Sequence, residues 1–172
     1  MTTSPDNIIL GDGVFAIGTT DIGLTRGGGS FVVEREYRVI EADGDYGPVK
    51  GRIRKVKSVA KLTMNALELL PANLEKLYPA TDLTTDTEPD TDTLEAESDI
   101  QTADYQENVT WTGKTKGGRD VVIKLDEAIN LEDINWSIVD KEEIVPEVTF
   151  TAVYDEATRD EEPWSITFTT TE

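Results

Sequence analysis

Alternation of apolar and polar residues with a period of two is the feature that most limits how this chain can fold. It occurs in four segments, residues 30–40, 52–69, 146–155 and 163–171. Successive side chains of a β-strand point to opposite faces, so each segment is expected to form a strand with one apolar and one polar face. An α-helix would need a period near 3.6 residues instead. The chain is therefore predicted to be mainly β.

The segments between these strands predict hairpins. Residues 41–51 read EADGDYGPVKG and join the first two strands; glycine, proline and acidic residues at this density are typical of a long exposed loop. A Lys-Gly-Gly turn within residues 108–125 predicts another hairpin. Shorter strands are expected at residues 13–18 and 134–139. Strands joined in this way are antiparallel, which favours an antiparallel β-sandwich or a barrel-like fold.

A single helix is predicted at residues 71–79, which read PANLEKLYP. Pro71 suits the first helical position, where its missing N–H costs nothing. Leu74, Leu77 and Tyr78 give the helix an apolar stripe. A helix of about two turns is not stable alone, so we expect it to lie on the flank of the sheet.

The length of 172 residues predicts one domain, spanning residues 1–172, with three less regular parts. Residues 1–12 are expected to form an N-terminal arm, and residues 41–51 the long loop. Residues 81–107 contain ten acidic residues and no Lys or Arg, so they are predicted to be a solvated acidic loop or insertion.

Composition excludes several classes of chemistry. The chain has no Cys and no His, which rules out disulfides, thiol catalysis and a Ser-His-Asp triad. Its formal net charge of −19 argues against nucleic-acid binding by the bulk surface, because phosphate contacts need Lys and Arg. The first residues lack a basic stretch followed by an apolar run, so no secretory signal is expected, and no apolar run is long enough to predict a transmembrane helix.

A calcium site is considered and set aside. Five acidic residues match the ligand spacing of an EF-hand loop: Asp86, Glu88, Asp90, Asp92 and Glu97. Thr91 stands where that loop needs glycine, Pro89 interrupts it, and no helices flank it. A solvated linker is the favoured interpretation.

Two further features are expected to be structural. The glycines at 27–29 precede a strand rather than a helix, so a turn is favoured over a phosphate-binding loop. Trp111, Trp136 and Trp164 lie on or near apolar strand faces, where core packing is favoured over a ligand platform. The abundant carboxylates single out no catalytic pair, so no enzyme, cofactor or metal is predicted.

Cations are concentrated in one place. Six of the sixteen fall within twelve residues without an acid among them: Lys50, Arg52, Arg54, Lys55, Lys57 and Lys61. Some are expected to neutralise Glu34 and Glu36 on the preceding strand. This pairing does not explain the excess, because Lys50, Arg52 and Arg54 lie near the 41–51 loop.

Four stretches carry a resemblance to a known family. They read GDGVFAIGTTDIGLTRGGGSFVVEREYR, IEADGDYGPVKGRIR, KLTMNALELLPANLEKLYP and EVTFTAVYDEATRDEEPWSITF. With them the chain resembles the tail tube, or major tail, proteins of long-tailed bacteriophages, which are related to type VI secretion tube proteins. The likeness covers nearly the whole chain and is absent from residues 81–107.

The resemblance implies a β-sandwich or barrel-like domain with a flanking helix, six copies of which form a ring. Rings stack into a tube with an acidic channel, through which the genome passes without specific binding. The expected partners are further copies of the chain and the tape-measure, tail tip and tail terminator proteins. The expected location is the tail of the virion, assembled in the host cytoplasm without a membrane.

Two groups of residues are predicted to serve such an assembly. Contact between subunits or rings is expected from Asp43, Asp45, Tyr46, Lys50, Arg52 and Arg54. Candidates for the channel wall, taken from polar strand faces, are Glu34, Glu36, Arg38, Thr149, Thr151, Thr167 and Thr169.

Three other functions are weighed against this one. A stand-alone acidic binding module, such as a mimic of DNA, would carry its acids over the outer surface of a monomer or small dimer. A carbohydrate-binding or adhesive domain would present an exposed aromatic platform. A hydrolase with paired carboxylates would need a pocket. The acidic binding module is the principal alternative.

Overall fold

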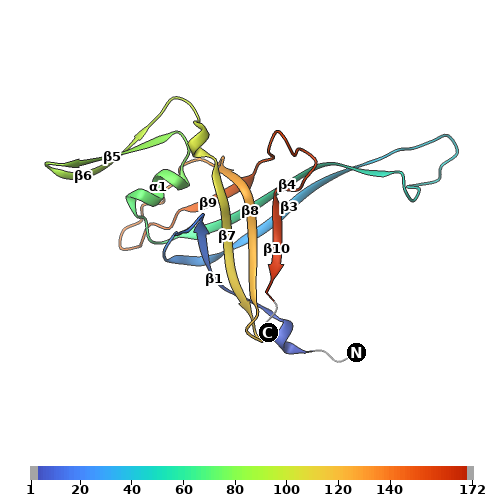
Figure 1. The fold of residues 1–172 in the computed structure, drawn as a ribbon, viewed down its shortest axis with the longest axis horizontal. Coiled ribbons are helices and arrows are strands. Elements are labelled where there is room, and N and C mark those ends of the chain that lie inside the picture. The colour runs from blue at the N-terminus through green and yellow to red at the C-terminus, as the bar shows by residue number, and fades with distance from the viewer. Residues whose placement is uncertain (1–3, 170–172) are drawn as a thin grey trace.

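The computed structural model describes residues 4–169 and consists almost entirely of antiparallel strands (Figure 1). The strands are β1 (Ile9–Ile17), β2 (Thr20–Asp21), β3 (Thr25–Val39), β4 (Ile53–Ala66), β5 (Thr81–Thr87), β6 (Asp90–Ala96), β7 (Gln106–Thr115), β8 (Asp120–Asn130), β9 (Glu147–Ala152) and β10 (Trp164–Phe168). One α-helix, α1 (Pro71–Leu77), and two short 3₁₀ turns, η1 (Pro5–Asn7) and η2 (Thr102–Asp104), complete the chain. The predicted mainly β fold with antiparallel sheets is confirmed and is consistent with a β-sandwich.

Eight strands form one strongly curved sheet in the order β2-β1-β7-β8-β9-β4-β3, with β10 paired to β8 beside this path. In Figure 1, β1, β7, β8 and β10 form one layer, and β9, β4 and β3 cross it as a second layer. The two layers face each other as in orthogonal sandwiches.

Strand β8 belongs to both layers. Its first part pairs with β10, through Leu125 and Trp164 for example, and its last part pairs with β9, through Ala128 and Ala152. On the neighbouring strand β7, Asn108 has a φ of 54°, a left-handed conformation that interrupts the regular pleat near this corner. A strand that bends in this way lets a single sheet fold over its own core.

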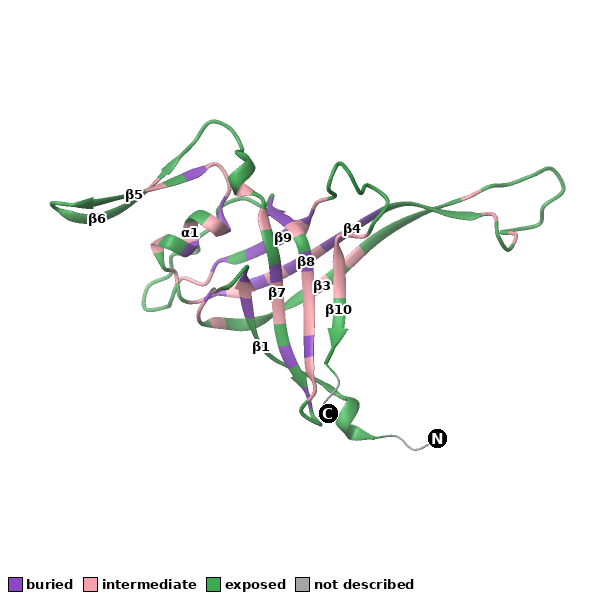
Figure 2. Cartoon of the chain, in the orientation of Figure 1, coloured by how far each residue is buried: buried purple, intermediate pink, exposed green. Residues whose placement is uncertain are grey.

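The core lies between the two layers and under the helix (Figure 2). Its largest side chains with less than 2 % exposure include Phe150, Ile22, Met64, Leu77 and Leu125. They come from β9, the β2–β3 connection, β4, α1 and β8, so every part of the sandwich contributes.

Helix α1 is confirmed where the sequence predicts it, and it is tied to the sheet at both ends. Asn73 Nδ2 donates to the carbonyl of Ile22 at 3.3 Å, and Asn130 Nδ2 donates to the carbonyl of Leu77 at 2.8 Å. Both asparagines are buried, so these bonds satisfy polar groups that water cannot reach. Leu77 itself is fully buried.

Residues 81–107 were expected to be a solvated acidic loop or an insertion, and the loop part of this prediction is wrong for residues 81–96. Strands β5 and β6 pair in register, Leu83 with Leu94 and Thr85 with Asp92, as a separate two-stranded sheet. Threonine recurs along both strands, and its branched side chain favours the extended conformation despite the acidic residues between. The hairpin projects from the body of the molecule on the side of α1 (Figure 1).

Two other local predictions are also wrong. Residues 134–139 form no strand; Trp136 instead donates its Nε1–H to the hydroxyl of Tyr78 at 3.0 Å, which anchors an irregular segment beside α1. The glycines at 27–29 are not a turn but part of β3, at a shift in its register with β4. Gly27 and Gly28 have φ of 89° and 79°, which only glycine adopts readily, and this allows the bulge.

The predicted arm at residues 1–12 is only partly separate from the fold. Residues 9–12 belong to β1, and residues 1–3 lie outside the described residues. Before β1, the carbonyls of Asp6 and Ile8 accept bonds from the backbone N–H groups of Gly117 and Lys116, at 2.9 and 2.8 Å. The described part of the arm is therefore held on the β7–β8 turn.

Candidate assembly surfaces

The β3–β4 hairpin extends well beyond the sandwich, and residues 40–52 form its tip (Figure 1). The tip contains no strand, and Figure 2 shows it almost wholly exposed, which confirms the predicted loop at 41–51. Tyr46 is fully exposed at this tip. Its aromatic ring therefore does not pack against the core of its own chain.

The loop is held in shape by one carboxylate. Asp45 Oδ2 accepts bonds from Arg52 Nη1 at 2.7 Å and from the backbone N–H of Ala42 at 2.8 Å. Arg52 and Asp45 were both predicted to contact another copy of the chain, but here they bind each other. Their role in the described chain is to close the loop.

The other predicted contact residues lie at the same end of the molecule. Asp43, Tyr46 and Lys50 are exposed on the loop. Arg54 lies at the root of the loop on β4, directly opposite Arg38 of β3. The structure thus gathers all of these residues on one projection.

The candidates for the channel wall divide between the two layers. Five lie on β3 and β9, in the layer β9-β4-β3: Glu34, Glu36, Arg38, Thr149 and Thr151. Thr167 lies on β10 and Thr169 just after it, in the other layer. The seven residues therefore do not form one surface in a single copy.

The five residues on β3 and β9 share the face of their layer that points away from the core. On this face Lys61 Nζ lies 3.2 Å from Glu34 Oε1, and the hydroxyls of Thr63 and Thr149 are 2.9 Å apart. Thr149 is buried by its neighbours, with 9 % exposure. The face is mainly polar, although Val32 and Val59 also lie on it, and it is built from three adjacent strands.

This polar face is not acidic by itself. Beside Glu34, Glu36 and Glu147 it carries four cations, namely Arg38, Arg54, Lys57 and Lys61. An acidic channel would have to draw its carboxylates from other segments, which hold most of the acidic residues of the chain.

The layer ends at an open edge. Strand β3 spans fifteen residues and, within the described part of the chain, pairs only with β4. An edge of this length presents unpaired N–H and C=O groups to any strand of suitable geometry.

Glu162 joins the base of the projecting hairpin to the rest of the sandwich. Its carboxylate accepts bonds from Ser58 Oγ at 2.8 Å and from Trp164 Nε1 at 3.0 Å, and it forms an ion pair with Lys55. Tyr154 adds its hydroxyl at 3.3 Å. Sequence reasoning missed this site because Lys55 and Ser58 lie more than a hundred residues away along the chain.

We expect this junction to make stability depend on pH. The bond from Lys55 lowers the pKa of Glu162 most, with Ser58 and Trp164 adding to it, from about 4.5 to about 2. Because the pKa is lower in the folded chain, the stabilisation is complete above about pH 5 and is lost as the pH falls from 4.5 towards 2. Glu162→Gln should lower the free energy of unfolding by about 1–2 kcal/mol at pH 7, since the site is partly solvated. Chemical denaturation between pH 2 and 7 measures both effects.

The matched control is Glu156→Gln, which removes a carboxylate that pairs with Arg159 on the exposed surface. Its effect should stay below about 0.5 kcal/mol. Equal losses for the two variants, or an unchanged pH profile for Glu162→Gln, would contradict the role given to Glu162.

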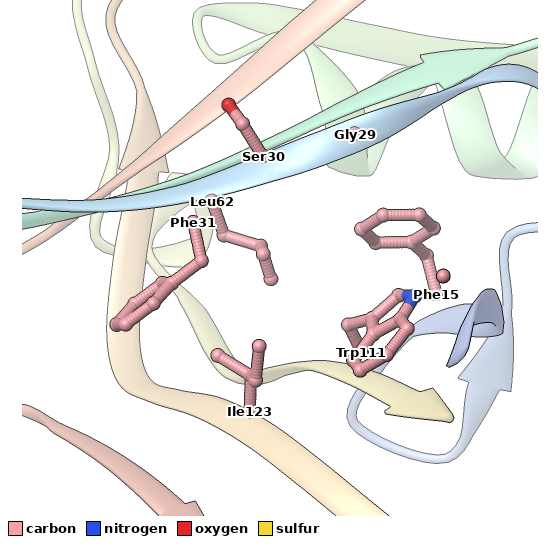
Figure 3. A pocket seen from close by; sticks show the side chains of 8 residues that line it. Phe15, Gly29, Ser30, Phe31, Leu62, Trp111 and Ile123 are labelled. Atoms are coloured by element: carbon pink, nitrogen blue, oxygen red, sulfur yellow. The ribbon is translucent and has the colours of Figure 1, made fainter. Parts of the chain in front are cut away.

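An apolar pocket of about 190 Å³ opens between the two layers (Figure 3). Phe15, Phe31, Leu62, Trp111 and Ile123 surround it. In Figure 3 the hydroxyl of Ser30 points away from these side chains, and the indole nitrogen of Trp111 lies among them. The lining of this pocket contains no carboxylate.

No family model matches this chain, and a search of curated proteins finds no similar sequence. Within residues 4–169, no three acidic side chains gather closely enough to hold a metal ion. Of the considered calcium loop, Asp86 lies on β5, Asp90 and Asp92 lie on β6, Glu88 lies in the turn between the strands and Glu97 follows β6. None of the helices described is long and apolar enough to cross a membrane.

Proposed function

We propose that this chain is a structural subunit that assembles with copies of itself into rings and stacked tubes, as the tail tube of a long-tailed bacteriophage. The observation that carries the proposal is the β3–β4 hairpin, which extends far beyond the core of its own chain and exposes its tip. Ordering a long hairpin costs conformational entropy, and the exposed tip gains little burial within its own chain to offset that cost. Burial of the tip against another copy would provide the missing stabilisation.

The open edge of β3 supports the same proposal. A monomer with an exposed fifteen-residue edge is prone to uncontrolled pairing, and closure into a ring removes such edges. The part of this polar face that lies over the sandwich, around Glu34, Thr149 and Thr151, suits the wall of a water-filled channel, in which interior and exterior residues alternate.

The resemblance supplies the finer parts of the proposal. Six copies would form each ring, and the tube would conduct DNA without binding it specifically. The tape-measure, tail tip and tail terminator proteins would contact the tube, and its place would be the tail of the virion. The net charge of −19 would repel DNA phosphates at short range.

Sedimentation velocity over a range of protein concentrations tests self-assembly. The intact chain should form species much larger than its 19.0 kDa monomer as the concentration rises. A monomer that persists at all concentrations would favour the acidic binding module, whose acids would then be expected to capture a basic partner protein.

We expect the tip of the hairpin to be essential for assembly and dispensable for folding. Replacing residues 41–51 by Asn-Gly, a sequence suited to a two-residue hairpin turn, should leave the thermal unfolding midpoint nearly unchanged. The same variant should no longer form the ring-sized species of the intact chain in sedimentation velocity. A second variant with eleven Gly and Ser residues in place of 41–51 keeps the length and removes the side chains. If either variant assembles as the intact chain does, the tip is not a contact between copies.

A further inference from the structure

Strands β3 and β4 place two arginines in a position that is unfavourable for an isolated chain. Arg38 and Arg54 are directly opposite each other in the register of the hairpin. Like charges in such cross-strand pairs destabilise a sheet. Lys57 follows on the same outer face, opposite Glu36 and next to the bulge at which the register shifts. Among the described residues, none of the three forms an ion pair.

The β5–β6 hairpin has the complementary arrangement. Asp82 and Glu95 are directly opposite each other, and Asp86 lies on the same face, four residues further along β5. All three are exposed, and within the part of the chain that the structure describes they form no ion pair. Residues 81–97 contain seven carboxylates and no cation. A two-stranded sheet of this kind is marginally stable in water without a partner.

The two hairpins cannot meet within one chain. They project from opposite ends of the molecule, β5–β6 beside α1 and the β3–β4 stem beyond β10 (Figure 1). Contact between different surfaces of two copies is head-to-tail, and contacts of this kind propagate into rings or filaments.

We infer that the acidic face of the β5–β6 hairpin of one copy docks on the basic outer face of the β3–β4 stem of a neighbouring copy. The acidic face consists of Asp82, Asp86 and Glu95, and the basic face of Arg38, Arg54 and Lys57. Docking brings each like-charged pair next to charges of opposite sign, so it relieves both repulsions at once. The inference rests on the proposed function in that copies of the chain must associate, and it assigns the surfaces that meet.

Two neutralised variants test this directly. The first, D82N/D86N/E95Q, keeps the basic stem and loses the acidic face. The second, R38Q/R54Q/K57Q, keeps the acidic face and loses the basic stem. Each variant alone lacks one half of the contact, so each should remain monomeric. An equimolar mixture should form a complex of one copy of each, because only one complete contact is possible between them.

Sedimentation velocity of each variant and of the mixture gives the result. The complex should form at about 20–50 mM salt and dissociate at about 0.5 M, where surface charges are strongly screened. The control D133N/D140N/E142Q removes three exposed acids outside the hairpin and should associate like the intact chain. Circular dichroism checks that every variant is folded.

The outcomes separate the inference from the proposed function. A one-to-one complex without rings of the intact chain would support the docking contact and count against the tube. Rings formed equally well by both variants would overturn the inference and leave the tube standing. A mixture that remains monomeric also overturns the inferred docking contact. If the intact chain then binds a short DNA duplex through Arg38, Arg54 and Lys57, the stem is a nucleic-acid site instead.

Discussion

Replacing Phe150 by alanine is expected to lower the free energy of unfolding by about 3–5 kcal/mol, a large part of the stability of a domain of this size. The side chain is 1 % exposed on β9, between the two layers of the sandwich. Its loss removes buried apolar surface and leaves a cavity that the curved sheet cannot close. Urea titration followed by tryptophan fluorescence measures the change.

Phe168→Ala is the matched control. This phenylalanine lies on β10 and is 43 % exposed, so its truncation should cost about 1 kcal/mol or less. If Phe168→Ala destabilised the protein as much as Phe150→Ala, the core would not lie between β9 and the facing layer.

Gly29→Val is expected to cost about 3 kcal/mol through overpacking. A Cβ at this position would collide with the backbone carbonyl oxygen of Thr63 and lie 2.8 Å from Phe15 Cζ. The carbonyl belongs to the neighbouring strand β4, so relief would require the two strands to separate. Thermal and urea denaturation of the variant provide the measurement.

Gly11→Val serves as its control, because Gly11 lines the same pocket and has no atom within 4 Å of an added Cβ. Its effect should lie within about 0.5 kcal/mol. A neutral Gly29→Val would mean that β3 and β4 are further apart at this point than the structure places them.

The hairpins of the sandwich were predictable because their signals are local. The alternation in residues 30–40 and 52–69 and the turn glycines at 117 and 118 identify strands and connections without knowledge of the rest of the chain. The path of β8 through both layers was not predictable in this way. It depends on pairing with β10 and β9, which follow it by more than fifteen residues.

Two segments differ from the secondary structure that their local patterns predict, and in each a second physical effect explains the difference. The apolar residues at 134–139 resembled a strand, yet Trp136 is held by Tyr78 at the end of the helix. The acidic residues at 81–97 suggested a loop, yet threonines between them favour an extended hairpin. In this segment the β propensity of threonine outweighs the effect of the charges.

The candidate surfaces were predictable as polar faces but not as contacts. Alternation correctly placed Glu34, Glu36 and Arg38 on one face of β3. Arg38 is opposite Arg54 because the register shifts at a bulge between residues 36 and 37. No local sequence pattern predicts this bulge. The pairing of Arg52 with Asp45 likewise depends on the closed shape of the loop.

Electron microscopy of the purified, concentrated protein in negative stain tests the central claim most directly. The account predicts hollow rings with six-fold symmetry, and tubes of stacked rings at higher concentration. If the variant without residues 41–51 forms neither rings nor tubes, their assembly depends on the tip of the projecting hairpin. Uniform small particles at every concentration, with light scattering of a stable monomer, would contradict the account and leave an acidic binding module as the better explanation.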